Sequence, residues 1–252
     1  AGFAGVFDGN GKTLTVNYSG SDEQAGIFAT LDGTVKNLRV AGSFTTTATA
    51  KVTLGAVAGK LGEKAQIVGC TNTAGIAMNV DASGTTVIGG IFGQGAAGNV
   101  IADNTNEGRI TVRRKTPGDA AAVAGVGGWA YSDVTGCVNK GEIRYSDEVS
   151  AAKAVYVGGL LGRLDIGKGY VVEGCRNEAP VTLATAQAAN NLLGGIAAYA
   201  NGENRDTPNT IRNCENRGDV LADAPVSDKA KTGQARMGGI CGGTAVFEGN
   251  TN

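Results

Sequence analysis

Short apolar runs rich in valine and isoleucine alternate along the whole chain with glycine, asparagine and small polar residues. No apolar stripe with a 3.6-residue period is present, so the pattern argues against amphipathic helices. One phrase recurs as Cys-x-Asn, then a small residue and then Ile or Val, as in Cys137-Val138-Asn139. Its first position, which we call the anchor, falls at residues 38, 70, 104, 137, 175, 214 and 250.

Apolar residues stand at fixed offsets from these anchors. Three residues before an anchor lies a Val or Ile, at Val35, Ile67, Ile101, Val134, Val172 and Ile211. Six residues after an anchor lies another apolar residue, at Phe44, Ile76, Ile110, Ile143, Val181 and Val220. A second phrase, which reads apolar-small-small-apolar, recurs between anchors at Ile88–Ile91, Val123–Val126, Val157–Leu160, Leu193–Ile196 and Met237–Ile240. The chain is therefore built from repeats of about 34 residues.

Helical repeats can have the same period, but the β-branched runs broken by Gly and Asn predict about three short strands per repeat. Stacked in register, such repeats predict an all-β fold, a parallel β-helix of about seven coils. We expect the coil to be right-handed, because crossovers between parallel strands are right-handed. Residues 1–252 would form one domain, with an opening strand within 1–20, repeats from about 21 to 252, and a truncated last repeat.

Stacking in register predicts ladders of equivalent residues along the β-helix. The anchor column would hold small residues, namely Cys70, Asn104, Cys137, Cys175 and Cys214. Two residues further along, an asparagine column would form an amide ladder at a turn with left-handed backbone, formed by Asn72, Asn106, Asn139, Asn177 and Asn216. The paired glycines have apolar neighbours on both sides, which predicts a bulge or a strand covered on both faces. These recurring residues are interpreted as structural.

Composition and charge restrict the function classes. The net charge of −1 gives no field that attracts nucleic acid or anionic lipid. Histidine is absent, which excludes Ser-His-Asp and Cys-His catalysis and His-ligated zinc. No apolar run approaches the ~20 residues of a membrane helix. We therefore expect no nucleic-acid partner, no membrane span, no cofactor and no catalytic residue.

The five cysteines include no Cys-x-x-Cys pair of the kind that binds zinc. Four of them occupy the anchor position, and Cys241 belongs to the second phrase. We expect buried free thiols, although Cys137 and Cys175 would stack closely enough for a bridge between coils.

The two phrases resemble the GLUG-motif repeats of bacterial surface proteins. Val157–Gly162 is the best match, Val134–Ile143 is close behind, and Phe7–Val16 resembles the family's first strand. The resemblance implies an exported scaffold on the bacterial cell surface, like the non-catalytic parts of adhesins and IgA-peptidase-like proteins of Bacteroidales-type bacteria. In the peptidase members, activity is attributed to a separate His-Glu-x-x-His region, and this chain has no histidine.

The segments between the phrases vary in length and sequence, mainly over 45–51, 113–122, 146–154, 184–191 and 222–235, and also over 165–170 and 201–209. In repeat proteins such insertions gather on one face and often form the binding surface. We therefore expect a non-catalytic, extracellular binding, adhesion or scaffold module whose partner is a host glycoprotein, a glycan or another surface subunit. The candidate ligand-facing residues are Trp129, Tyr131, Tyr170 and Tyr199, because aromatic rings stack on sugars; the alternative is that they pack at strand ends.

Two other functions stay open at this point. Many parallel β-helices are polysaccharide lyases or glycoside hydrolases, and a hydrolase needs two carboxylates about 5–10 Å apart. The candidate pairs are Asp22 with Glu23, Asp165 with Glu173, Glu203 with Asp206, and Asp219 with Asp223. The chain could also be the stalk of a larger IgA-peptidase-like metalloprotease. The segment Gly162–Gly169 nearly matches a phosphate-binding loop, but it lacks the Ser or Thr and a following helix, so we interpret it as a turn.

Overall fold

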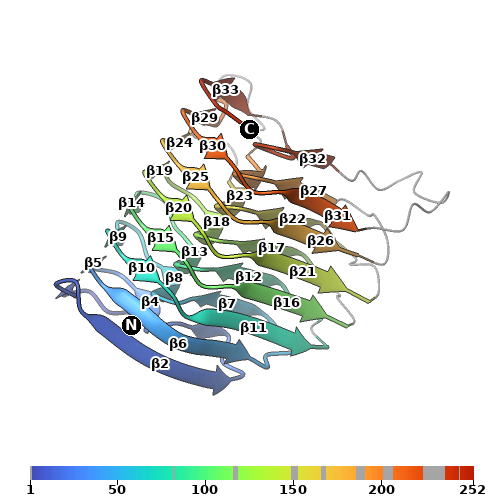
Figure 1. The fold of residues 1–252 in the computed structure, drawn as a ribbon. Coiled ribbons are helices and arrows are strands. Elements are labelled where there is room, and N and C mark those ends of the chain that lie inside the picture. The colour runs from blue at the N-terminus through green and yellow to red at the C-terminus, as the bar shows by residue number, and fades with distance from the viewer. Residues whose placement is uncertain are drawn as a thin grey trace.

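The structure is a computed structural model that describes residues 2–81, 83–115, 119–148, 153–165, 169–185, 191–200, 207–223, 236–243 and 245–252. Every regular element in these ranges is a β-strand, and the strands stack as four parallel sheets (Figure 1). Among the same residues, no helix has the length and apolar character needed to cross a membrane. The all-β parallel fold predicted from the repeat is confirmed.

Each coil visits the sheets in the same order, and we number the sheets one to four in that order. Within the described ranges, the first sheet contains β1 (Val6–Asp8), β5 (Thr34–Lys36), β9 (Gln66–Val68), β14 (Val100–Ala102), β19 (Val134–Thr135), β24 (Val171–Glu173), β29 (Thr210–Arg212) and β33 (Val246–Glu248). The second sheet contains β2 (Thr13–Gly20), β6 (Arg39–Thr46), β10 (Thr71–Asn72), β11 (Gly75–Val80), β15 (Thr105–Asn106), β16 (Ile110–Arg114), β20 (Val138–Asn139), β21 (Ile143–Asp147), β25 (Arg176–Asn177), β26 (Val181–Ala184), β30 (Glu215–Asn216) and β31 (Val220–Asp223).

The third and fourth sheets complete each coil. The third sheet contains β3 (Gln24–Ala25), β7 (Val52–Gly55), β12 (Thr86–Gly89), β17 (Ala121–Ala124), β22 (Val155–Gly158), β27 (Asn191–Gly194) and β32 (Arg236–Gly238). The fourth sheet contains β4 (Phe28–Leu31), β8 (Ala58–Leu61), β13 (Phe92–Gln94), β18 (Gly127–Ala130), β23 (Leu161–Leu164) and β28 (Ala197–Tyr199). The prediction of about three strands per repeat was therefore wrong, because the chain folds back between the third and fourth sheets within the second phrase.

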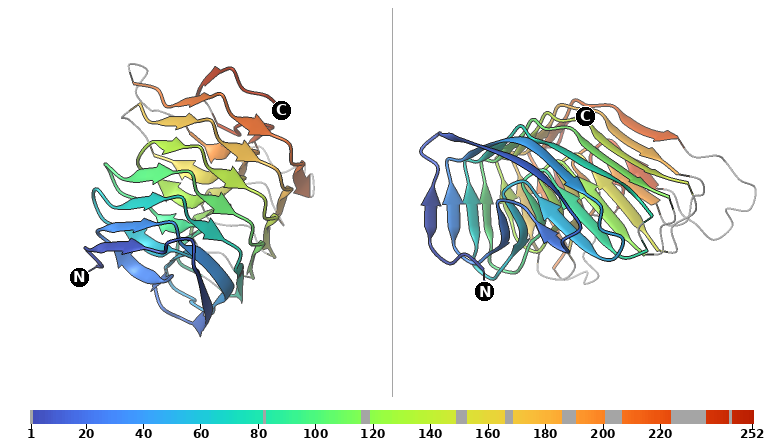
Figure 2. Two further views of the ribbon diagram at one scale, coloured as in Figure 1. Left: turned by 60° about the vertical axis from the view of Figure 1, so that its left-hand side comes forward. Right: turned by 90° about the horizontal axis from the view of Figure 1, so that it is seen from below.

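The coil is right-handed. In Figure 1 the front strands of the second sheet run from left to right, the return strands run behind them, and the chain climbs from β2 towards β33. Six coils of the described chain supply a strand to all four sheets, a seventh supplies strands to three, and β33 begins an eighth in the first sheet. The coil count thus differs slightly from the seven expected. The two ends of the chain lie at opposite ends of the stack (Figure 2).

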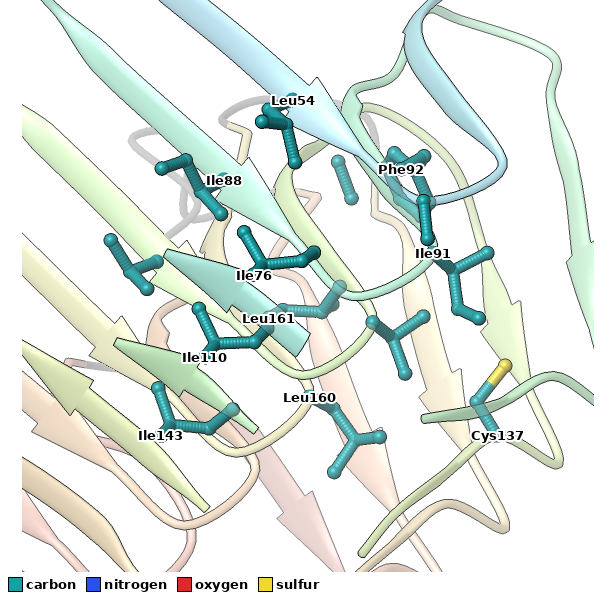
Figure 3. Packing of buried hydrophobic residues seen from close by; sticks show 14 of the residues in the cluster. Leu54, Ile76, Ile88, Ile91, Phe92, Ile110, Cys137, Ile143, Leu160 and Leu161 are labelled. Carbon is teal, nitrogen blue, oxygen red and sulfur yellow. The ribbon is translucent and has the colours of Figure 1, made fainter. Parts of the chain in front are cut away.

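Columns of apolar side chains fill the interior of the stack. Ile76, Ile110 and Ile143 are register neighbours on successive strands and lie one above another in Figure 3. The Val and Ile column before the anchors is also buried, from Val35 to Ile211. The last coil is the exception, because Phe247, which continues that column, is 47% exposed. Burial of these columns is the main contribution to stability.

The second phrase forms the end of a third-sheet strand and the corner that follows it. Strands β7, β12, β17 and β27 are buried at all four positions, so they are covered on both faces as predicted. A Cβ atom at Gly93 of the fourth sheet would lie 2.7 Å from the Leu54 backbone nitrogen, and one at Gly128 would lie 2.8 Å from that of Ile88. Because these glycines have no side chain, the backbone of the fourth sheet can lie directly against the backbone of the third sheet.

The left-handed backbone lies at a different position from the one predicted. The asparagine ladder lies in short strands of the second sheet, and its residues have no positive φ. Positive φ instead recurs immediately before each anchor, at Asn37, Gly69, Asp103, Gly136, Gly174, Asn213 and Gly249. Gly, Asn and Asp are the residues that adopt this conformation at least cost, which explains their recurrence there.

Candidate functional site

The four corners of the coil fall into two kinds. Two residues join the first sheet to the second in every coil from β5 to β29. Two residues also join the third sheet to the fourth in every coil from β7 to β28. The other two corners vary: the connection from the second sheet to the third has three to twelve residues, and that from the fourth to the first has two to ten. Because the strands are in register, the variable connections all begin at the same two edges. Much of the predicted variable sequence lies outside the described residues, including parts of 113–122, 146–154, 184–191, 222–235, 165–170 and 201–209.

A cluster of aromatic rings around Arg163 lies beside the corner between the fourth and first sheets. The Arg163 guanidinium carbon is 4.3 Å from the Trp129 ring centroid, 5.7 Å from that of Tyr199 and 5.8 Å from that of Tyr156. Arg163 also pairs with Asp165 at 3.2 Å. We call Trp129, Tyr131, Tyr156, Arg163 and Tyr199 the aromatic–arginine cluster.

Strand register explains how the cluster forms. Trp129, Arg163 and Tyr199 are neighbours on β18, β23 and β28, so their side chains stack along the β-helix. Tyr131 follows two residues after Trp129 and stacks on it, with ring centroids 5.8 Å apart and planes 15° apart. Tyr156 reaches the cluster from β22, and its ring centroid is 5.5 Å from that of Tyr199. Cation–π contacts of this kind contribute roughly 1 kcal/mol each when they are partly exposed.

This geometry changes the chemistry that the sequence suggested. Arg163 covers one face of Trp129, and Gln94 is the register neighbour on the other side. A sugar therefore cannot stack on the Trp129 face that Arg163 covers. The cluster offers ring edges, tyrosine hydroxyls and a guanidinium, which suit hydrogen bonding to a polar or acidic ligand. The Trp129 Nε1–H and the Arg163 Nε–H are buried and make no hydrogen bond within the described chain.

Three of the four predicted ligand-facing residues belong to the cluster, and the fourth does not. Tyr170 packs partly buried against the core, and its backbone N–H donates to Asn209 Oδ1 at 3.0 Å. Burial raises the pKa of Tyr170, and the nearby Asp165 and Asp133 raise it further. Burial is also the main cause of the raised pKa of Tyr131 and of Tyr156. These phenols are therefore protonated hydrogen-bond donors at neutral pH.

Sequence reasoning missed Tyr156 and Arg163. Arg163 follows the second phrase by three residues, the same offset that Trp129 and Tyr199 have in their repeats. That shared offset was the available signal, because residues at one offset stack in one column. Tyr156 lies in the third sheet, and its contact with the fourth-sheet column depends on the fold-back that the repeat pattern did not predict.

The asparagine ladder is continuous, and it is buried from Asn72 to Asn216. Each Nδ2 donates to Oδ1 of the next asparagine at 2.7–2.8 Å, from Asn72 to Asn252. The same Nδ2 also donates to the carbonyl two residues ahead, for example from Asn139 to Gly141 at 2.9 Å. The ladder asparagines pack against the second small residue of the second phrase; a Cβ at Gly159 would lie 2.6 Å from Asn177 Cγ. The two recurring phrases thus form one packing unit, which is structural.

The anchor column is held by a second set of bonds. Asn104 Nδ2 donates to the Ile67 carbonyl at 2.8 Å, and Cys175 and Cys214 place their thiols 3.6 Å from the carbonyls of Val134 and Val172. Asparagine and cysteine therefore serve the same acceptor, the carbonyl of the apolar residue in the preceding coil.

None of the five cysteines, all of which lie in the described ranges, is in a disulfide, and the four at anchors are buried. Burial raises the pKa of Cys70 to about 11. Hydrogen bonding among stacked thiols raises the pKa of Cys175 and lowers that of Cys214. The four anchor thiols are packing residues of the interior, and Cys241 is half-buried.

Three carboxylates of the proposed catalytic pairs, Asp165, Glu173 and Asp22, are engaged by other side chains. Asp165 pairs with Arg163, and Glu173 accepts from Arg212 at 2.8 Å. Tyr18 donates to Asp22 at 2.9 Å. The pair of Glu203 and Asp206 lies outside the described residues, as does the middle of Gly162–Gly169. In the part of the chain that the structure describes, no group of three or more Cys, Asp or Glu side chains has the arrangement of a metal site.

A comparison of the chain with models of known protein families, with curated proteins and with solved structures finds no match.

Proposed function

We propose that the chain is a non-catalytic, extracellular binding module of a bacterial surface protein, which holds variable connections on a rigid β-helix. The observation that carries this proposal is the contrast between corners. Two corners keep two residues through the regular coils, whereas the other two vary up to ten and twelve residues. A fold that needs only packing has no use for such variation at two registered edges, whereas a recognition surface does.

The proposed binding surface lies at the corner between the fourth and first sheets, and the aromatic–arginine cluster beside that corner supports this choice. The longest connection at this corner, residues 200–209, directly follows Tyr199. Tyrosine, tryptophan and arginine are the side chains most enriched at the centres of binding interfaces. The proposed partner is a host glycoprotein or glycan with polar or acidic groups, and the chain supplies no chemistry of its own.

The experiment combines a glycan array with binding to immobilised host-matrix glycoproteins. Hits are then titrated by intrinsic fluorescence, because Trp129 is the sole tryptophan of the chain. We expect a saturable change in Trp129 emission with the partner found on the array. Empty results on both the array and the matrix would contradict the proposal.

Matched variants locate the surface. Arg163→Ala and Tyr199→Ala should each weaken binding at least tenfold, as expected for interface residues at about 1.4 kcal/mol per decade. Arg144→Ala is the control, because Arg144 is an exposed arginine on the second sheet, away from the cluster. Equal losses in the control and the cluster variants would place the binding surface elsewhere.

A further inference from the structure

Strand β2 is an eight-residue strand at the N-terminal end of the stack. It pairs with β6 along its whole length, and no strand of the described chain pairs with its other side. In Figure 1, β2 forms the base of the second sheet, with no strand drawn beneath it. Its free edge is therefore long enough to pair with another strand.

The free edge presents the backbone groups of alternate residues. The carbonyls of Lys12 and Gly20 both accept hydrogen bonds from the β6 side, from Arg39 and Thr47. Backbone groups alternate in direction along a strand, so the even-numbered residues face β6. The N–H and C=O groups of the odd-numbered residues face the free edge; these are Thr13, Thr15, Asn17 and Ser19.

This edge carries none of the features that protect natural edges from pairing. Its sequence, Thr-Leu-Thr-Val-Asn-Tyr-Ser-Gly, contains no charge and no proline. At the opposite end of the stack, every edge strand of the first three sheets carries charge, in Asp223 of β31, Arg236 of β32 and Glu248 of β33. Charged residues and proline are the usual means of blocking edge pairing. The C-terminal end of the stack therefore has this protection, whereas the β2 edge does not.

The side chains of β2 are also self-complementary. The inward-facing residues are Leu14, Val16 and Tyr18, and Leu14 is 39% exposed. In an antiparallel pairing of β2 with a second β2, centred on Val16, Thr15 lies opposite Asn17 and Leu14 lies opposite Tyr18. All odd-numbered residues then exchange hydrogen bonds, and the apolar residues of both strands cover each other.

We propose that β2 is an interface at which two copies of this chain pair as a symmetric antiparallel dimer, in the register that places Val16 opposite Val16. Such an isologous interface closes on itself and leaves both C-terminal ends and both variable corners free. The inference goes beyond the proposed ligand binding, because it makes the module bivalent and so raises its avidity for a repetitive surface.

The test measures self-association and register on the whole chain. Sedimentation velocity over a roughly hundredfold range of concentration should show a monomer–dimer equilibrium. Thr15→Pro removes an N–H that faces the free edge and no bond to β6, so it should abolish the dimer and leave the thermal unfolding midpoint within a few degrees. A monomer at every concentration in the unmodified chain, or a dimer that survives Thr15→Pro, would overturn the proposal.

Cysteine trapping tests the register independently. In the proposed register, Val16→Cys faces its own copy across a non-hydrogen-bonded pair, with Cα atoms about 4.5 Å apart. With glutathione disulfide as oxidant, two thiols are converted into one disulfide, and a covalent dimer should form. Thr13→Cys faces Ser19 of the second copy and should give no covalent dimer. Equal trapping of the two variants, or none of Val16→Cys, would overturn the register.

Discussion

At the scale of the residue, the position before each anchor is occupied either by glycine or by Asn or Asp, and both kinds of residue adopt the same backbone conformation. The column has positive φ throughout and reads Asn37, Gly69, Asp103, Gly136, Gly174, Asn213 and Gly249. Where an Asn or Asp precedes a glycine in the column, its side-chain oxygen covers that glycine, as Asp103 covers Gly136. Glycine is thus required in some coils by conformation alone and in others by conformation and space.

Two glycines of this column separate these requirements. Gly174 has φ of +62° and no atom within 4 Å of an added Cβ. Gly174→Ala should therefore lower the free energy of unfolding by roughly 1 kcal/mol, because only the left-handed conformation is unfavourable for alanine. Gly136 has φ of +61°, and its Cβ would collide with Asp103 Oδ1. Gly136→Ala should lower the free energy of unfolding by roughly 2 kcal/mol, because the Asp103 carboxylate must also move. Urea unfolding of both variants measures the difference, and equal costs would refute the role assigned to Asp103.

The asparagine ladder gives a second residue-scale prediction. Asn139 is fully buried, and its Nδ2 donates to Asn177 Oδ1 at 2.8 Å and to the Gly141 carbonyl. Asn139→Asp replaces this donor with an oxygen that faces two acceptors. The free energy of unfolding of the variant should therefore fall by roughly 3–5 kcal/mol at neutral pH.

Asn252→Asp is the matched control for this change. Asn252 is the last member of the ladder and is exposed, and it accepts from Asn216 through Oδ1, which aspartate retains. Its effect should stay within about 0.5 kcal/mol. Comparable losses in the two variants would show that the ladder does not depend on amide donors.

At the scale of the element, a network of hydrogen bonds and an ion pair holds together the corner between the second and third sheets, where the variable connections begin. Arg114 is fully buried, and its Nη2 donates to the carbonyls of Gly84 and Asp119 at 3.2 and 2.9 Å. The Asp119 carboxylate in turn accepts from the Thr85 hydroxyl at 2.8 Å, and it pairs with Lys153 at 3.0 Å. One buried arginine and one carboxylate therefore link three successive coils, which gives the variable connections a fixed base.

This network predicts a pH dependence of stability. Hydrogen bonds from Thr85 and the Ala120 N–H, with the bond from Lys153, lower the pKa of Asp119 to about 2. An unfolded aspartate titrates near 3.9, so the contribution is complete above about pH 4 and is lost as the pH falls towards 2. Asp119→Asn should lower the free energy of unfolding by about 1 kcal/mol at pH 7, after allowance for partial exposure, and by only a small fraction of that at pH 2.

Urea unfolding at several pH values checks this expectation. Glu142→Gln serves as the control, because Glu142 pairs with Arg109 at 3.1 Å on the exposed surface. An exposed pair of this kind contributes about 0–1 kcal/mol. If the Asp119→Asn difference persists at pH 2, the carboxylate does not act through its charge.

At the scale of the whole molecule, the two repeat phrases predicted the interior columns and the parallel stacking. They did not predict the fourth sheet or the whole aromatic–arginine cluster. The offsets of Ile76 and Ile110 from their anchors predicted the interior columns, because stacking in register needs only a constant spacing. The fourth sheet was not predicted, since its fold-back depends on close contact between Gly93 and the third-sheet backbone. The aromatic–arginine cluster was predicted only in part for the same reason: Arg163 and Tyr156 meet across that fold-back.

Surface charge is also arranged by the stack as a whole. Glu107 contacts Arg39, which lies two coils before it, and Lys140 in the following coil, and Glu173 contacts Arg212 in the following coil. These pairs bring opposite charges of different coils together on the surface of the stack. These exposed pairs add little stability individually, so the cohesion of the stack comes from the ladders and the interior columns.

Cohesion that passes only between neighbouring coils predicts an ordered loss of structure. In a solenoid each coil is stabilised by the coils above and below it, so the end coils open first. The two ends differ: Phe3 and Phe7 pack against Phe28 within the first coil, whereas β31, β32 and β33 expose Leu221, Met237 and Phe247. Hydrogen exchange followed by mass spectrometry should therefore find β31–β33 exchanging first, β1 and β2 next, and the strands from β11 to β27 last. Exchange of the middle coils together with the C-terminal strands would mean that the stack unfolds as one cooperative unit rather than from its open end.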